Sequence, residues 1–401
     1  MSKPSPHVVI AGGGIGGLTA ALALLKAGTD CDVYEQAPEL REVGAGLQLA
    51  PNGTRVLFAL GLEQDIRRDG VETGDKVVRL WSTGQTWSLF DPTVATPVER
   101  FGSPMYLMHR GDLHAMLVEA VRREKPGAIH IDARCVDFEQ DEAGVRLKLE
   151  DGRHVTGDML IGADGLHSRV RQKLFGPATP KFTGIMAWRG LAPIERLPAH
   201  LRRPMATQWL GPNGHVTCYP VHRGKLLNMV GEVERDDWRL ESWVERGSRE
   251  ECLKDFPGWH RDLLDIIDGI DILYKWALFL REPLPQWSVG RVTLLGDACH
   301  AMLPFLGQGA NMAIEDGLVL ARCVRQCVSN PVTALKRYEV ARRERTMDIV
   351  HRSAKMAATF HNDALSESKA GASYIASNWN PDRIRTRYDT IYKYDARSVT
   401  I

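Results

Sequence analysis

A glycine-rich turn close to the start of the chain constrains the fold more than any other feature. Residues 8–11 are all apolar and predict a buried parallel strand, and residues 15–26 predict the helix that follows it. The turn between them has the pattern G-x-G-x-x-G, formed by Gly12, Gly14 and Gly17. The first glycine permits a tight turn, the second lets the backbone approach a pyrophosphate, and the third lets helix and strand pack closely. This unit therefore predicts an α/β protein that binds a dinucleotide.

An acidic residue after the next strand supports this interpretation. Residues 31–34 predict the second strand, which ends at Glu35, 18 residues after Gly17. A carboxylate at this distance accepts hydrogen bonds from a ribose, and it favours FAD or NAD over NADP. The helix that begins at Ile15 and Gly16 directs its positive N-terminus toward the phosphates. The alternative is a glycine-rich turn in an ordinary α/β protein, which leaves the position of Glu35 unexplained.

Length and composition fit an enzyme that works in the cytoplasm. The chain has 401 residues, 44% of them hydrophobic and 25% charged, which is enough for a large core. The net charge of +1 predicts neither a nucleic acid nor a membrane as partner. We expect no signal peptide, because the first residues have no apolar run. Seven scattered cysteines without a C-x-x-C pair predict no metal site and a reducing compartment.

The later part of the chain changes character twice. Residues 145–149 and 154–161 predict a hairpin. Over about 182–287, short runs rich in Trp, Tyr and Val alternate with turns, which is typical of an antiparallel sheet. Residues 291–295 predict a return to a buried parallel strand, and residues 308–342 predict long helices. The antiparallel region is therefore expected as an insertion between two parts of one parallel-sheet domain.

Three predicted strands end in glycines or in a glycine and an acid. These ends are Gly12–Gly17, Gly162–Gly165 and Gly296–Asp297. Ligands of doubly wound sheets bind outside the carboxyl ends of the strands. Each end taken alone also fits an ordinary strand–turn–helix junction. Together they predict one long cofactor enclosed by three strand ends.

At this point the motifs resemble a known family. They are Gly12-x-Gly14-x-x-Gly17, the segment 162–171 (GADGLHSRVR) and the segment 296–304 (GDACHAMLP). In this order they are similar to the single-component FAD-dependent aromatic hydroxylases, the group of para-hydroxybenzoate hydroxylase. The segments 42–48 (EVGAGLQ) and 109–114 (HRGDLH) resemble most the salicylate and 3-hydroxybenzoate hydroxylases. The resemblance extends to about Arg345.

The resemblance implies a Rossmann-like FAD-binding domain with a parallel sheet, an inserted substrate domain with an antiparallel sheet, and C-terminal helices. Residues 1–180 would form the first part of the FAD-binding domain, with a substrate-side segment at about 70–105. Residues 181–287 would form the substrate domain, and residues 288–358 would return to the FAD-binding domain. The tail, 359–401, is aromatic and polar, and we assign it no role.

The resemblance also assigns residues to FAD. The early glycines would hold the pyrophosphate and Glu35 the ribose, while Asp297 would bind the ribityl chain. Asp164 would lie near the pyrophosphate, and the helix start at 309–311 would place N–H groups near the flavin N1 and O2. The residues expected to bind FAD are Gly12, Gly14, Ile15, Gly16, Gly17, Glu35, Gln36, Arg110, Val136, Asp164, Gly165, Gly296, Asp297, Gly309, Ala310 and Asn311.

The chemistry implied is hydroxylation of a small aromatic acid, such as salicylate or 3-hydroxybenzoate. NADH or NADPH would reduce the flavin and bind only transiently, because the sequence has one G-x-G-x-x-G. O2 would then form a flavin C4a-hydroperoxide that transfers oxygen to the ring. Alternatives are a hydroxypyridine acid such as 6-hydroxynicotinate as substrate, or a flavin dehydrogenase or oxidase of the same fold. The oligomeric state is left open, a homodimer included.

Four residues are candidates for the substrate side. His215 is expected to act as the base, since an imidazole titrates near the working pH. Tyr219 lies four residues further along the same strand, so it faces the same side and would hold the phenol or carboxylate. Gln48 would hydrogen-bond the substrate. Pro304 is the residue that is commoner in the family at this position, where 3-hydroxybenzoate 6-hydroxylases can have a glutamine. The alternative for His215 and Tyr219 is a purely structural role in the sheet.

Overall fold

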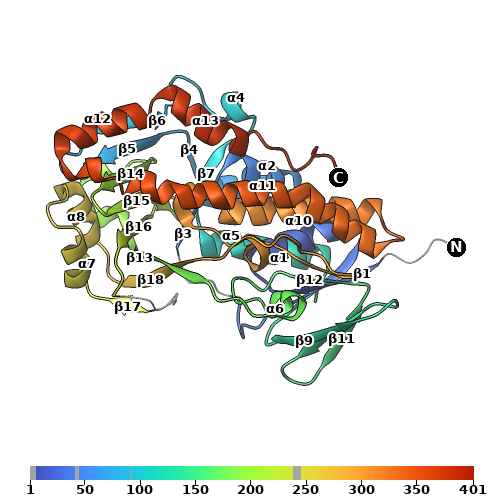
Figure 1. Cartoon of the computed structure of the whole chain (residues 1–401). Coiled ribbons are helices and arrows are strands. Elements are labelled where there is room, and N and C mark those ends of the chain that lie inside the picture. Colours follow the sequence, from blue (N-terminus) through green and yellow to red (C-terminus); the bar gives the residue numbers. More distant parts are fainter. Residues whose placement is uncertain (1–5, 41–44, 92, 238–244) are drawn as a thin grey trace.

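The parallel sheet brings the three glycine-containing strand ends side by side. The computed structural model describes residues 6–40, 45–91, 93–237 and 245–401, so Glu42–Gly44 of the segment 42–48 lie outside it (Figure 1). All neighbours in this five-stranded sheet run parallel. Its order is β19 (Val292–Leu294), β12 (Met159–Gly162), β1 (His7–Ala11), β2 (Asp30–Tyr34) and β8 (Ile129–His130). The predicted parallel sheet is therefore confirmed, with β1, β12 and β19 adjacent.

Helices cover this sheet closely. The strand residues Val8, Val9 and Ile10 are fully buried. Helix α1 (Ile15–Lys26) packs against α5 (Arg110–Glu124) and α10 (Gly309–Gln326). A Cβ on Gly317 of α10 would lie 2.7 Å from the backbone nitrogen of Ala20, so this glycine permits the close helix crossing. The packing fixes the N-terminal ends of α1 and α10 at the carboxyl edge of the sheet.

An eight-stranded sheet forms the other half of the molecule. Its order is β17 (Arg246–Gly247), β18 (Leu273–Leu280), β13 (Lys181–Pro193), β16 (Leu226–Glu234), β15 (Gly214–Val221), β14 (Ala206–Gly211), β5 (Lys76–Leu80) and β6 (Thr86–Phe90). It is antiparallel, as predicted, except that β14 and β5 pair in parallel. Strands β5 and β6 come from the segment 70–105, which the sequence placed on the substrate side.

A small sheet connects the two halves. It consists of β3 (Gly46–Leu49), β7 (Met105–His109) and β4 (Val71–Thr73). A Cβ on Gly46 would lie 2.5 Å from Cε2 of Tyr219 and 2.7 Å from Cγ of Asn228. The backbone N–H of Gly46 also donates to Oδ1 of Asn228, at 2.7 Å. Glycine at this position therefore lets β3 lie directly against the large sheet.

The predicted hairpin at 145–149 and 154–161 is wrong in its second strand. Strand β10 (Val145–Leu149) pairs with β11 (His154–Gly157) and with β9 (Cys135–Gln140) in a separate three-stranded sheet. The chain leaves this sheet after β11. After Asp158 it continues as β12 beside β1. Asp158 accepts the backbone N–H of His7 at 2.7 Å, and a Cβ on Gly157 would meet Val9 at 2.7 Å. The apolar run 159–161 is therefore buried in the parallel sheet instead of pairing locally.

The tail that received no role is helical and well packed. The long helix α11 (Pro331–Phe360) passes along both sheets, and η4 (Asp363–Ser366), α12 (Ser368–Asn378) and α13 (Pro381–Tyr392) follow it over the eight-stranded sheet (Figure 1). Tyr388 and Tyr392 of α13 are buried against Phe90 of β6, with ring centroids 5.4 and 6.0 Å away. The tail thus closes one side of the substrate half.

The remaining helices are shorter. They are α2 (Pro51–Ala59), α3 (Glu63–Asp69), α4 (Pro97–Phe101), α6 (Arg169–Phe175), η1 (Ile194–Arg196), η2 (Ala199–Leu201), α7 (Arg249–Asp255), α8 (Arg261–Asp268), α9 (Asp297–His300) and η3 (Pro304–Leu306). Among the described residues, no helix combines the length and the apolar character needed to cross a membrane.

Candidate active site

Two adjoining cavities follow the carboxyl edge of the parallel sheet. We call the one of about 590 Å³ the dinucleotide lobe and the one of about 520 Å³ the central lobe. The dinucleotide lobe is lined by the glycine turn and by Glu35, whereas the central lobe reaches the eight-stranded sheet. The residues that line both lobes are Gly14, Gln36, Ala163, Asp164, Gly165 and His167. Together the lobes form one elongated site, as a long cofactor and a small substrate require.

The three glycines of the turn differ in what surrounds them. A Cβ on Gly12 would lie 2.3 Å from the carbonyl oxygen of Ala163, and a Cβ on Gly17 would lie 2.0 Å from that of Gly12. A Cβ on Gly14 would meet nothing within 4 Å. Gly12 and Gly17 are therefore required by packing, while the space beside Gly14 belongs to the cavity. This open space at the N-terminus of α1 fits a pyrophosphate.

Glu35 is already engaged by the turn but retains acceptor capacity. Its Oε2 accepts the N–H of Gly13 at 2.7 Å, and its Oε1 accepts the N–H of Ala37 at 2.9 Å. The side chain is half-buried and lines the dinucleotide lobe. A carboxylate has about four lone-pair sites, so two hydrogen bonds leave room for ribose hydroxyls.

The two carboxylate oxygens of Asp164 differ. One accepts hydrogen bonds from the backbone, and the other has no hydrogen-bond partner among the described residues. Its Oδ2 accepts the N–H groups of Arg169 and Val170 at the start of α6. Its Oδ1 is buried and has no hydrogen-bond partner in the part of the chain that the structure describes. Burial raises the pKa of this carboxyl. Because Asp164 lines both lobes, the unsatisfied oxygen is suited to bind a cofactor.

Most other predicted FAD residues line the central lobe. Its lining includes Ile15, Gly16, Arg110, Gly296, Asp297, Gly309 and Ala310. Asn311 does not line it, because its side chain is buried and holds the backbone of Ala50, Gln48 and Gly307 with hydrogen bonds of 2.9 to 3.0 Å. Val136 is 44% exposed and lines neither lobe, although Cys135 beside it does. The expected contribution of Asn311 is its backbone N–H at the start of α10; this contribution and the contact of Val136 with FAD stay predictions.

One face of the eight-stranded sheet forms the far wall of the central lobe. His215, Thr217 and Tyr219 are every second residue of β15, so their side chains point to the same face of the sheet. All three line the central lobe. The register pairs Thr217 with Gln208 of β14 and with Val230 of β16. Other lining residues of this wall are Lys76, Arg189, Glu232 and Trp276. The wall thus carries several polar groups on an otherwise apolar surface.

His215 belongs to a chain of hydrogen bonds that reaches solvent. Its Nδ1 lies 2.8 Å from Nε2 of His361, and Nδ1 of His361 lies 2.9 Å from Oε1 of Glu234. His215 is 1% exposed, whereas the side chain of Glu234 is 49% exposed. Burial, assisted by His361, lowers the pKa of His215 well below its usual value. The imidazole is therefore neutral at pH 7 and able to accept a proton.

A second carboxyl lies on the other side of the same ring. Oε2 of Glu232 lies 3.3 Å from Nε2 of His215 but has no aligned hydrogen bond within the described residues. Burial raises the pKa of Glu232 well above its usual value, which keeps this carboxyl protonated. Sequence reasoning missed Glu232, Glu234 and His361. Glu232 could have been noticed as an acid inside the apolar strand Leu226–Glu234. His361 could not have been found in this way, because it lies 146 positions from His215 in the sequence.

The other substrate-side candidates also lie at the central lobe. Tyr219 is buried, and burial raises the pKa of its phenol, which stays protonated. Oε1 of Gln48 accepts a hydrogen bond from Nζ of Lys76 at 3.3 Å. Pro304 begins η3 directly before α10. Arg189 is buried with its guanidinium 5.3 Å from the centre of the Trp276 ring.

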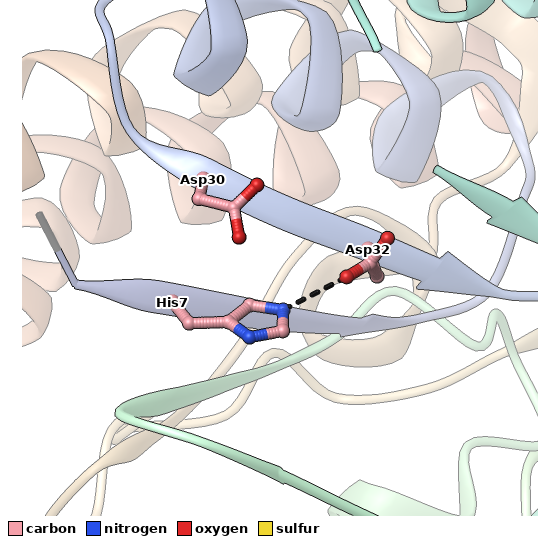
Figure 2. Close-up of side chains that lie close together, drawn as sticks. All are labelled: His7, Asp30 and Asp32. Carbon is pink, nitrogen blue, oxygen red and sulfur yellow. Dashed lines mark ion pairs between the residues drawn. The ribbon is translucent and has the colours of Figure 1, made fainter. Parts of the chain in front are cut away.

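Two further clusters lie outside the cavity lining. His300 is buried beside Asp316, with Nε2 2.6 Å from Oδ2. At the amino ends of β1 and β2, Nε2 of His7 lies 3.0 Å from Oδ2 of Asp32, with Asp30 nearby (Figure 2). Nζ of Lys125 lies 2.8 Å from Asp30 and 3.0 Å from Asp32, so a cation already offsets these carboxylates.

Comparison with known proteins agrees with this site. Residues 6–353 match the FAD binding domain family. The chain is 40% identical over 361 residues to a 3-amino-4-hydroxybenzoate 2-monooxygenase of Streptomyces platensis, covering 90% of both chains. It is 39% identical over 372 residues to 3-hydroxybenzoate 6-hydroxylase 1 of Aquipseudomonas alcaligenes, covering 91% of both. The crystal structure of Klebsiella pneumoniae HpxO with FAD and uric acid superimposes with a TM-score of 0.82 at 27% identity, covering 97% of both chains.

These matches confirm the resemblance that the motifs suggested. The fold, the elongated site and the space at Gly14 all agree with a bound FAD. Relatives that share about 40% of the sequence over nine-tenths of its length carry out one type of reaction, the oxygenation of an aromatic ring. The chain therefore belongs to the FAD binding domain family and is an FAD-dependent monooxygenase of the aromatic-hydroxylase type.

Proposed function

We propose that this enzyme hydroxylates the ring of a small hydroxylated aromatic acid, such as 3-hydroxybenzoate or salicylate, with electrons from NADH or NADPH. The observation that carries the proposal is His215, a neutral buried imidazole that lines the central lobe opposite the predicted FAD residues. A hydroxyl on the ring is the group that such a base activates. The relatives named above act on benzoates with a hydroxyl group, in agreement with this substrate class.

The chain would hold FAD along both lobes. The turn at Gly14 and the start of α1 would bind the pyrophosphate, Glu35 the ribose, and Asp297 with the start of α10 the flavin end. When bound, FAD accepts a hydride from NAD(P)H and activates O2, which is the chemistry that amino-acid side chains lack. The protein contributes the position of the ring, the movement of its proton and the exclusion of water.

The proton pathway starts at the substrate hydroxyl. His215 accepts its proton, which increases electron density on the ring and prepares it for an electrophilic oxygen. His361 takes part of the resulting charge through the 2.8 Å contact and passes a proton toward Glu234 at the surface. Apolar residues of the lobe, among them Phe305 and Leu306, keep water from the reacting carbon.

Steady-state turnover tests the proposal. We expect NADH or NADPH oxidation by the purified, FAD-containing protein to increase with at least one acid of a panel and to yield a hydroxylated product. The panel comprises 3-hydroxybenzoate, salicylate, 4-hydroxybenzoate, 3-amino-4-hydroxybenzoate and 6-hydroxynicotinate. Product and hydrogen peroxide are measured together. Peroxide without product for every stimulating acid would contradict these acids as substrates, and no stimulation at all would contradict the substrate class.

Replacing His361 with alanine should lower the hydroxylation rate about tenfold, less than loss of the base itself. His215 keeps its place but loses the group that receives its proton. Added imidazole should restore part of the rate in this variant, a response that a purely structural defect would not give. His351→Ala, an exposed histidine in α11, is the matched control and should be unaffected. An unchanged rate in His361→Ala would remove His361 from the pathway.

We also propose that the enzyme works in the cytoplasm. All seven cysteines are unpaired, and six of them are buried. NADH and NADPH are supplied inside the cell, and free thiols persist in that reducing compartment.

A further inference from the structure

A lysine that the sequence analysis did not consider reaches the central lobe. Lys76 lies at the start of β5, where its backbone pairs with Ala206 of β14, and its side chain lines the lobe together with Gln48. Its ammonium donates to Oε1 of Gln48 at 3.3 Å and lies 5.8 Å from the centre of the Tyr388 ring. Both partners are neutral. Tyr388 belongs to α13, so the tail forms part of the surroundings of this lysine.

No anionic group in the described part of the chain balances the charge of Lys76. No ion pair of the described residues includes it, and the charged group that acts on it is Arg387, which is also a cation. Burial and Arg387 lower the pKa of Lys76 to about 8. A half-buried ammonium without an anion is unfavourable, and an anionic ligand in the lobe would relieve this. The ammonium of Lys76 can therefore bind a carboxylate in the lobe, and its hydrogen bond to Gln48 holds it in position.

We propose that Lys76 binds the carboxylate of the substrate and that this contact makes the enzyme select aromatic acids over neutral phenols. The inference rests on the proposed function and adds the residue that recognises the acid group. Lys76 and His215 lie on strands separated by one strand, β14. The residue of β5 in register with His215 is Leu80, four positions from Lys76, so the backbones of Lys76 and His215 are roughly 16 Å apart. Their side chains line the same lobe, and one aromatic ring between them presents its carboxylate to Lys76 and its hydroxyl to His215.

Arg189 is the competing cation of the same wall. It lies on β13, on the other side of His215 from Lys76 in the strand order. Its guanidinium already lies over Trp276, at 5.3 Å from the ring centre. An ammonium and a guanidinium at opposite ends of the wall predict different orientations of the ring. Replacing each residue in turn therefore shows which cation binds the carboxylate.

Ligand binding to the FAD-loaded protein tests the inference. The probes are 3-hydroxybenzoate and its neutral carboxamide, each titrated by the change in flavin absorbance. Wild type should bind the acid about ten- to a hundredfold more tightly than the amide, the range of a charge-assisted hydrogen bond. Lys76→Met should lose this preference while its affinity for the amide changes less than about threefold. Lys225→Met, an exposed lysine of the turn after β15, should keep the preference.

Each outcome decides between explanations. An intact preference in Lys76→Met overturns the inference, and loss of preference in Arg189→Met alone assigns the carboxylate to Arg189. FAD content and thermal unfolding show whether Lys76→Met is folded; if it is not, Lys76→Gln replaces it, with the same expected loss. Failure of the proposed function looks different, because then no acid of the panel stimulates NAD(P)H oxidation by the wild-type enzyme.

Discussion

Replacing His215 with alanine is expected to lower ring hydroxylation by about a hundredfold or more while FAD stays bound. The imidazole is buried, neutral at pH 7 and connected to solvent through His361 and Glu234. Two neighbouring groups of this wall hold their protons, because burial raises the pKa of the Tyr219 phenol and of the Glu232 carboxyl. Without the base, the hydroxyl on the ring stays protonated and the ring is a poor acceptor of oxygen.

The variant should fail in a characteristic way. Reduction of FAD by NAD(P)H does not need this base, so the nucleotide should still be consumed and hydrogen peroxide should replace the hydroxylated product. Product, peroxide and nucleotide are therefore measured in the same reaction. His222→Ala is a suitable control, because His222 follows the same strand but is exposed and lies outside both lobes. Wild-type product formation in His215→Ala would exclude His215 as the base.

The parts of the site that the sequence could predict are local in the chain. Gly12, Gly14 and Gly17 are close together, and the turn that they form has the same physical requirements wherever it occurs. Asp164 and Asp297 follow directly after buried strands, so the rule for ligands at strand ends places them at the cavity. His215 and Tyr219 share one face of a strand because their spacing is even. In each case a short segment carries the whole argument.

The parts that could not be predicted depend on distant segments. His361 meets His215 only because α11 passes across the eight-stranded sheet, and Lys76 reaches the lobe only because β5 pairs with β14 of that sheet. The expected hairpin ends at Asp158 for the same reason, a contact with a distant segment. Residues 159–161 pair with β1 in the parallel sheet, and only residues 154–157 pair with β10. The aromatic and polar composition of the tail does not indicate where it packs, and its role in closing the substrate half comes from contacts of Tyr388 and Tyr392 with Phe90.

Gly14→Glu should abolish FAD binding without unfolding the protein. Gly14 has φ −73° and ψ −179°, a conformation that any residue adopts, and a side chain there would enter open space. The new carboxylate would lie where the pyrophosphate is expected, and like charges in such a site cost several kcal/mol. We therefore expect a colourless protein whose affinity for FAD falls at least about a hundredfold. FAD content after purification and titration with free FAD measure the effect.

Gly17→Ala is the matched variant that separates ligand binding from packing. Its Cβ would lie 2.0 Å from the carbonyl oxygen of Gly12, which is backbone and cannot move aside without shifting α1 from β1. We expect a loss of about 3 kcal/mol or more in the free energy of unfolding of the apoprotein, measured in urea. The apoprotein of Gly14→Glu should unfold like the wild-type apoprotein. If Gly14→Glu were instead purified with a full complement of FAD, the pyrophosphate would have to lie elsewhere, and the assignment of the dinucleotide lobe would be wrong.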